Sequence, residues 1–181
     1  MYDIAVIGAG PAGATLARII GGSYRVLLID KRQFGDSPEG ASSRKCCGGL
    51  LAPDAQRMLS KLGLGLPKSV MEEPQLFVVI DIQQSLERYY RRIYININRQ
   101  KFDGWLLFMT PPSVNVRTAC RLESYSWKGD CFRLILLQDN RTYVEQTKIL
   151  VGGRRRFFKR SLPVGSETMF SEKIFRNTGM G

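Results

Sequence analysis

The residues near the start of the chain that could do chemistry form a glycine-rich turn. Gly8, Gly10 and Gly13 have the spacing that seats the pyrophosphate of a dinucleotide between a strand and a helix. Gly8 permits the tight turn, Gly10 lets the backbone approach the phosphates, and Gly13 lets the helix pack closely on the strand. The free N–H groups at the start of the helix add positive potential. The turn therefore predicts a phosphate site, with a purely structural strand-to-helix corner as the alternative interpretation.

An acidic residue follows at the distance that such a site requires. Asp30 lies 20 residues beyond Gly10 and is expected to close a strand, where its carboxylate can accept hydrogen bonds from the hydroxyls of an adenosine ribose. Lys31, the next residue, is a further candidate contact to the cofactor. An acid at this position favours a ribose without a 2′-phosphate. Taken by themselves, the glycines and the acid are compatible with either NAD or FAD.

Two strands and one helix must position these residues. The segment 3–7 is nearly all apolar, as in a central parallel strand covered on both faces. We expect a helix from Pro11 to about Ile20, with small residues on its near face, and a second buried strand over 25–29. Together they form one β-α-β unit, which should be right-handed.

The rest of the chain is predicted to add two helices and several strands. The connection 33–49 is long enough to be functional in its own right. The fold class is α/β, a Rossmann-like fold with a parallel sheet and an antiparallel β-meander. The expected helices are 53–62 and 102–108, and the expected strands are 76–82, 86–97, 114–119, 132–137 and 143–151.

Composition narrows the classes of function. The 181 residues are 44% apolar and 24% charged, as in ordinary soluble domains. The chain has no histidine, and its four cysteines have no pairing or metal-ligand spacing, so neither a metal site nor a His-dependent triad is expected. We find no signal peptide and no membrane-length apolar run, and we therefore expect a cytoplasmic protein without a transmembrane segment.

Two further motifs decide between the cofactors. A basic-Cys-Gly loop spans 44–50 (Arg-Lys-Cys-Cys-Gly-Gly-Leu), and Arg99, Phe102 and Asp103 form an Arg-x-x-Phe-Asp motif followed by Leu106. With the glycine turn, these motifs resemble the geranylgeranyl reductase family of FAD-dependent oxidoreductases, in the group built like p-hydroxybenzoate hydroxylase. The resemblance covers residues 1 to about 151 and implies a truncated FAD-binding fold.

The resemblance implies roles for individual residues, although it identifies no catalytic residue. Each role has an alternative interpretation. Gly48 and Gly49 could simply form a tight loop turn, Arg99 could be a solvated residue at a helix start, and Cys47 could be a small apolar loop residue. The implied contacts are the pyrophosphate and ribose for Ala12 and Asp30, the isoalloxazine or ribityl chain for Cys47, Gly48 and Gly49, the flavin cofactor for Arg99, and the adenine for the backbone of Leu122.

The resemblance breaks off after residue 152. The family continues with an Ala-Asp-Gly turn that helps to hold the flavin, whereas this chain continues Gly-Arg-Arg-Arg-Phe-Phe-Lys from Gly153. Codons for these residues, read one nucleotide later, can encode Ala-Asp-Gly-Ala-Phe-Ser-Asn. We therefore expect an incomplete FAD-binding domain over 1–151 and, over 152–181, a poorly ordered basic tail read in a shifted frame. A genuine divergent tail is the alternative. Five of the +11 net charges lie in this tail, which argues against a selected nucleic-acid site.

For the family, the implied reaction is flavin-mediated hydride transfer that reduces carbon-carbon double bonds of an isoprenoid substrate. The implied partners are a small-molecule or isoprenoid-lipid substrate and NAD(P)H or ferredoxin as electron donor. A flavin-dependent monooxygenase of the same architecture remains an alternative, as does a non-catalytic fragment that binds nucleotide or acts through its basic charge. Catalysis by this chain alone is not expected.

Overall fold

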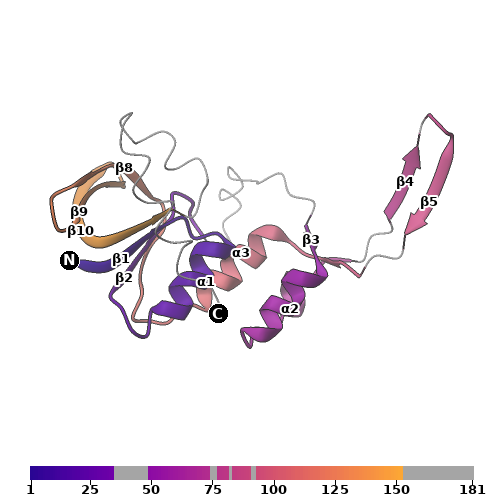
Figure 1. Cartoon of the computed structure of the whole chain (residues 1–181), viewed down its shortest axis with the longest axis horizontal. Helices are drawn as coiled ribbons and strands as arrows, with labels where there is room; N and C mark the ends of the chain where they lie inside the picture. Colours follow the sequence, from indigo (N-terminus) through magenta and orange to yellow (C-terminus); the bar gives the residue numbers. More distant parts are fainter. Residues whose placement is uncertain (35–48, 74–76, 82, 91–92, 153–181) are drawn as a thin grey trace, which may run out of the picture. The chain divides into compact units, whose positions relative to one another are not determined.

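The computed structural model describes residues 1–34, 49–73, 77–81, 83–90 and 93–152 (Figure 1). The chain divides into two compact units. Of the described residues, those of Met1–Gln33 and 110–152 form one unit, and those between Phe34 and Met109 form the other. The glycine turn and Asp30 belong to the first unit, and Arg99 belongs to the second.

A six-stranded sheet forms the first unit, with the strand order β7-β2-β1-β10-β9-β8. Four neighbouring strands of this sheet are parallel: β7 (Asn115–Arg117), β2 (Val26–Ile29), β1 (Tyr2–Ile7) and β10 (Arg141–Gly152). The sheet continues as an antiparallel meander through β9 (Phe132–Gln138) and β8 (Cys120–Trp127). The predicted combination of a parallel sheet and a meander is confirmed.

Strand β10 joins the two parts of this sheet. Its first half pairs antiparallel with β9, and its second half pairs parallel with β1. The change occurs at Thr147, which is opposite Phe132 on one side and Tyr2 on the other. Thr147 is fully buried, and its hydroxyl donates a hydrogen bond to the carbonyl oxygen of Ile149 at 2.9 Å. The long strand thereby holds the meander in register with the strands that carry the glycine turn.

Two sets of apolar residues bury the sheet of the first unit. Helix α1 (Pro11–Ile20) packs on β1 and β2 through Gly13, Ala14 and Ala17. Strand β8 of the meander contacts β2. The meander strands curve as an arc in Figure 1. The core cluster accordingly combines residues of the parallel strands with residues of the meander: Ala5, Leu27, Ile29, Cys120, Leu134 and Leu136.

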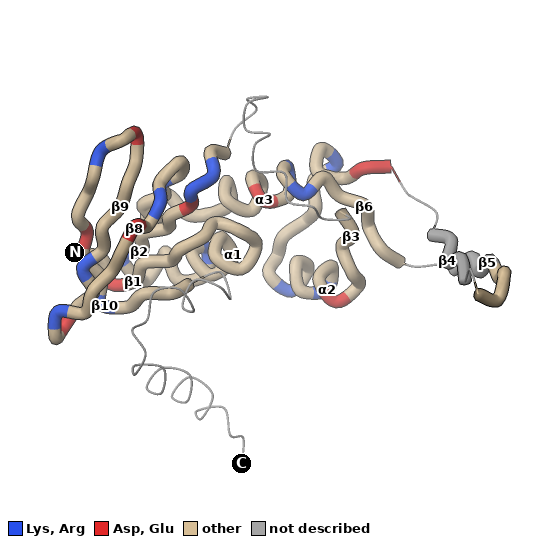
Figure 2. Tube along the Cα trace, turned by 90° about the horizontal axis from the view of Figure 1, so that it is seen from above, with Lys and Arg blue, Asp and Glu red and all other residues tan. Residues whose placement is uncertain are grey.

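Tight turns close the meander. Asp139 and Asn140 connect β9 to β10 with φ angles of 50° and 56°, which is the pattern of a type I′ hairpin. Gly129, with φ of 98°, allows the turn between β8 and β9. Charged residues cluster at these turns, at the red and blue ends of the meander in Figure 2. This charge keeps the hairpin tips in water.

The second unit contains short elements. Strands β3 (Leu50–Leu51) and β6 (Ile95–Asn96) pair antiparallel, as do β4 (Phe77–Asp81) and β5 (Leu86–Tyr90). Its helical elements are α2 (Pro53–Lys61), the 3-10 turn η2 (Lys68–Val70) and α3 (Arg99–Phe108). Helix α3 and η2 contact each other.

The structure corrects several expected boundaries. Helix α3 begins three residues before the expected start, because Asn98 caps it by accepting hydrogen bonds from the N–H groups of Gln100 and Lys101. The single strand expected over 86–97 is instead β5 and β6, which have different pairing partners. Strand β8 was not expected, because most of its residues are exposed and its sequence lacks a continuous apolar run.

Candidate functional site

The glycine turn joins β1 to α1 in the conformation that the sequence predicts. Gly8 has φ of 109°, a left-handed value that strongly favours glycine, and its N–H donates to the carbonyl oxygen of Ile29 at 2.6 Å. Gly10 is the N-cap of α1, and Pro11 is the first helical residue, where its missing N–H costs nothing. The turn therefore reverses the chain within a few residues and fixes it to the end of β2.

Gly13 explains why the helix can lie so close to the strand. A Cβ built on Gly13 would overlap the carbonyl oxygen of Gly8 and lie 3.3 Å from Cγ1 of Val6. The predicted role of Gly13 in close packing between helix and strand is confirmed. The same contact holds the first turn of α1 next to the glycine loop.

The N-terminus of α1 is built to favour an anion. Its N-cap residue, Gly10, has no side chain to cap the helix, and the first turn contains no acidic residue. Ala12 is exposed in this turn, so no bulky side chain of its own covers the N–H groups. Unsatisfied N–H groups and the helix dipole attract negative charge at this position. The geometry is suited to a phosphate.

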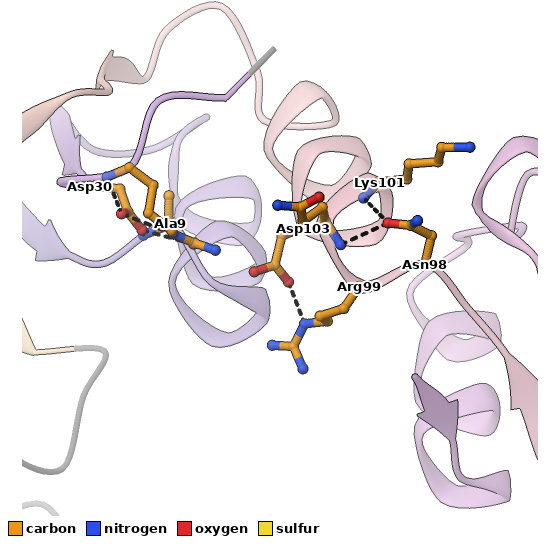
Figure 3. Close-up of polar contacts among 8 residues, drawn as sticks. Ala9, Asp30, Asn98, Arg99, Lys101 and Asp103 are labelled. Atoms are coloured by element: carbon orange, nitrogen blue, oxygen red, sulfur yellow. Dashed lines mark hydrogen bonds and ion pairs between the residues drawn. The ribbon is translucent and has the colours of Figure 1, made fainter. Parts of the chain in front are cut away.

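Asp30 is tied to this turn by direct hydrogen bonds. Its carboxylate is buried, with 7% of the residue exposed, and Oδ2 accepts a hydrogen bond from the N–H of Ala9 at 2.8 Å (Figure 3). Burial by itself would raise the pKa of Asp30, but hydrogen bonds from Arg32 and Ala9 and the nearby positive charge hold the pKa below its usual value. Asp30 is therefore a charged acceptor next to the glycine turn.

Arg32 is a part of this arrangement that sequence reasoning missed. Its backbone N–H and its Nε donate to Oδ1 of Asp30 at 2.8 Å and 3.1 Å, and Nη2 donates to Oδ2 at 2.9 Å. Both side chains are largely buried, at 10% and 8% exposure. A basic residue two positions after an acid that closes a strand was the signal available in the sequence.

The other two candidates of this unit differ in their setting. Lys31 is exposed, with its side chain in solvent beside Asp30 in the sequence. Leu122 lies in β8 opposite Leu136, and its side chain packs against the core cluster. A bulge interrupts the pairing between Leu122 and Ser124. The bulge alters the local path of the backbone next to Leu122, which is the part of this residue expected to meet adenine.

Arg99 is held by a buried acid within the second unit. Its Nε donates to Oδ1 of Asp103 at 2.7 Å, one helical turn along α3 (Figure 3). The Asp103 side chain is 1% exposed, whereas the Arg99 side chain is 29% exposed. The pair therefore anchors the base of the guanidinium in the interior and leaves part of the side chain at the surface.

Of the basic-Cys-Gly loop over 44–50, the structure describes Gly49 and Leu50. Cys47 and Gly48 lie outside the described residues. Gly49 has φ of 67°, and a Cβ at this position would lie 2.5 Å from the carbonyl oxygen of Ile97. The N–H of Ile97 in turn donates to the carbonyl oxygen of Gly49 at 2.6 Å. Close contact between two backbones thus requires glycine at position 49, whatever the loop binds.

An open hollow of about 340 Å³ lies in the second unit, between α2, β6 and the segment 63–66. Leucine side chains make up much of its lining. Nε2 of Gln56, which also lines the hollow, donates hydrogen bonds to the carbonyl oxygens of Leu51 and Ile93, each at 2.9 Å. The hollow contains none of the predicted site residues. We therefore do not assign the hollow as the cofactor site, despite its volume.

Comparison with curated proteins identifies relatives for part of the chain. Protein CbrA of Shigella sonnei (strain Ss046) and protein CbrA of Escherichia coli (strain K12) are each 51% identical over 118 residues. Each match covers 64% of this chain and 32% of the relative. The chain thus spans about a third of the length of these relatives. No protein-family model matches the chain.

Solved structures share its fold. A geranylgeranyl bacteriochlorophyll reductase-like protein from Thermoplasma acidophilum aligns with a TM-score of 0.66 at 19% identity, covering 83% of this chain and 38% of that one. A triple mutant of the flavin-dependent brominase Bmp2 aligns with a TM-score of 0.67 at 21% identity, covering 84% and 38%. p-Nitrophenol 4-monooxygenase PnpA from Pseudomonas putida aligns with a TM-score of 0.61 at 15% identity, and the match covers 84% of this chain and 40% of that one. The chain therefore has the Rossmann-like α/β fold of these structures.

Among the residues that the structure describes, no helix combines the length and the apolar composition needed to cross a bilayer.

Proposed function

We propose that this chain is the FAD-binding part of a flavin-dependent oxidoreductase. The observation that carries the proposal is the joint geometry of the glycine turn, the uncapped start of α1 and the buried carboxylate of Asp30, which accepts a hydrogen bond from Ala9 of the turn. Together they place an anion-attracting helix end beside a charged hydrogen-bond acceptor. These are the two requirements for holding the pyrophosphate and the ribose of an adenine dinucleotide.

FAD is favoured over NAD by residues of the second unit. The Arg-x-x-Phe-Asp motif begins α3, where Asp103 holds Arg99 by its Nε. Arg99 would contact the cofactor, and Cys47, Gly48 and Gly49 would approach the isoalloxazine or ribityl chain, with the backbone of Leu122 beside adenine. When bound, FAD supplies hydride transfer, and the protein supplies binding and orientation.

For the whole protein, we propose reduction of carbon-carbon double bonds in an isoprenoid substrate. The resemblance of the basic-Cys-Gly loop and of the Arg99 motif supports this reaction class, as does the fold shared with a geranylgeranyl bacteriochlorophyll reductase-like protein. The same fold also occurs in p-nitrophenol 4-monooxygenase PnpA, so hydroxylation is the second candidate. NAD(P)H or ferredoxin would donate electrons. Because the chain spans about a third of its curated relatives, we propose that it does not catalyse the reaction alone.

A binding experiment tests the nucleotide site directly. The chain is mixed with FAD, passed through gel filtration and examined by its visible spectrum, and ADP and FMN are then used as competitors. The proposal expects ADP to displace FAD and FMN to compete weakly, because the proposed site would recognise the adenosine diphosphate half of FAD. Asp30→Asn should weaken ADP binding about tenfold, the effect of losing one charged acceptor at a ribose.

Gly22→Ala serves as the matched control, because Gly22 is exposed and a Cβ there meets no atom within 4 Å. A protein that stays colourless and binds neither FAD nor ADP would overturn the proposal. Binding of DNA or anionic vesicles that weakens steeply with salt would then support the alternative of a basic interaction fragment.

The hypothesis of a shifted frame has its own test in the coding DNA. Restoring the alternative frame after residue 152 should introduce the Ala-Asp-Gly turn and tighten FAD binding. Wobble bases that do not permit this reading, or no gain in affinity on restoring it, would contradict the hypothesis.

A further inference from the structure

The carboxylate of Asp30 accepts hydrogen bonds from four N–H groups. Oδ1 accepts from the backbone N–H and from Nε of Arg32, at 2.8 Å and 3.1 Å. Oδ2 accepts from the N–H of Ala9 and from Nη2 of Arg32, at 2.8 Å and 2.9 Å. A carboxylate offers about four lone-pair positions. In this structure the acceptor capacity of Asp30 is therefore fully used.

The four donors differ in how firmly they are held. The N–H groups of Ala9 and Arg32 belong to the backbone at the glycine turn and at the end of β2, so the fold fixes them. The other two belong to the Arg32 side chain, which rotamer changes can remove. A ribose presents two vicinal hydroxyls, which donate two hydrogen bonds. The number of removable donors thus equals the number that the ribose brings.

We infer that the Arg32 side chain occupies the ribose-binding positions of Asp30 and must be displaced by the ribose diol when a nucleotide binds. The inference rests on the proposed nucleotide site and adds a residue that sets its specificity. A ligand must supply donors that replace the bidentate guanidinium, so a ribose with both hydroxyls is selected over groups that cannot satisfy a buried carboxylate. Burial of Arg32 beside Asp30, at 10% exposure, makes this exchange a condition of binding rather than a surface rearrangement.

The expected effect is a gain in affinity when Arg32 is removed. The apparent dissociation constant of a nucleotide equals the intrinsic constant divided by the fraction of molecules in which the Arg32 side chain leaves the site open. A pair that is closed about nine tenths of the time therefore weakens binding about tenfold. A general effect of positive charge predicts the opposite, because loss of a cation near the phosphates would weaken binding.

Isothermal titration calorimetry with two probes separates these effects. ADP reaches both the helix end and Asp30, whereas inorganic pyrophosphate reaches only the helix end. Arg32→Ala and Arg32→Met should bind ADP about 3- to 10-fold more tightly than the unchanged chain. Neither variant should bind pyrophosphate more tightly. Arg32→Met keeps most of the apolar stem and serves where Arg32→Ala fails to fold. Arg133→Met, at an exposed position in β9, removes the same charge as a control.

Each outcome has one meaning. Tighter ADP binding with unchanged or weaker pyrophosphate binding supports displacement of Arg32. ADP binding that is unchanged or weaker in both Arg32 variants overturns the inference, while pyrophosphate binding shows that the helix-end site still exists. If neither probe binds any of the variants, the proposed nucleotide site itself fails.

Discussion

The backbone of Gly13 packs directly against the carbonyl group of Gly8, so that a Cβ on Gly13 would overlap the carbonyl oxygen and lie 3.1 Å from the carbonyl carbon. Neither group can move alone, because Gly8 is hydrogen-bonded to β2 and Gly13 lies in the first turns of α1. This contact sets the distance between the phosphate-binding helix end and the sheet.

Gly13→Ala should therefore push α1 away from β1. We expect a loss of about 3 kcal/mol in the free energy of unfolding, at the upper end of what overpacking costs, together with a loss of ADP binding. Urea unfolding of the variant measures the first and calorimetry the second. Gly22→Ala is the control, because a Cβ there meets nothing within 4 Å. Equal losses in the two variants would contradict the packing interpretation.

Arg99→Ala should destabilise the second unit through the acid that Arg99 contacts. Asp103 is buried, and Arg99 donates to it at 2.7 Å, so removal of the guanidinium takes a favourable charge away from a carboxylate in the interior. We expect a loss of about 2 kcal/mol, partly recovered in the double variant with Asp103→Asn. A double-mutant cycle by urea unfolding measures the coupling. Strictly additive losses would mean that the two side chains act independently.

Ala119→Gly should stabilise the first unit. Ala119 has φ of 50°, a left-handed conformation that a Cβ disfavours, and its N–H donates to the carbonyl oxygen of Arg32 at 2.9 Å. Relief of this strain outweighs the larger entropy of glycine in the unfolded chain, with an expected gain of about 0.5–1 kcal/mol. Thermal unfolding checks the sign. Ala55→Gly in α2, where no such strain exists, should instead lose about 1 kcal/mol.

Asp3→Asn should change the pH dependence of stability. Arg25 donates side-chain hydrogen bonds to both carboxylate oxygens of Asp3 and lowers the pKa of Asp3 to about 2. An unfolded Asp has a pKa of about 3.9, so the unfolded chain takes up this proton first as the pH falls. The advantage of the original chain over Asp3→Asn should be complete above about pH 5 and disappear as the pH falls through about 2. Urea unfolding at several pH values tests this. A difference that stays constant with pH would exclude the linkage.

The local features of the site could be read from the sequence because they follow from backbone geometry. A glycine at position 8 is required by one φ angle, and the β-α-β unit follows from apolar runs and a small-residue helix, so both predictions agree with the structure. The spacing of Asp30 from the turn likewise follows from the lengths of one helix and one strand. These features involve residues within about thirty positions of each other, where the chain offers few alternative paths.

Only the tertiary structure decided which side chains pair. The bidentate contact of Arg32 with Asp30 depends on the side-chain conformation of Arg32 just after β2, and the requirement for Gly49 depends on the backbone of Ile97, far along the chain. Likewise, strand β10 binds both β1 and β9 because one long strand can present different edges to different partners. These pairings depend on side-chain orientation and on packing between distant segments. A pattern of residue types along one segment determines neither.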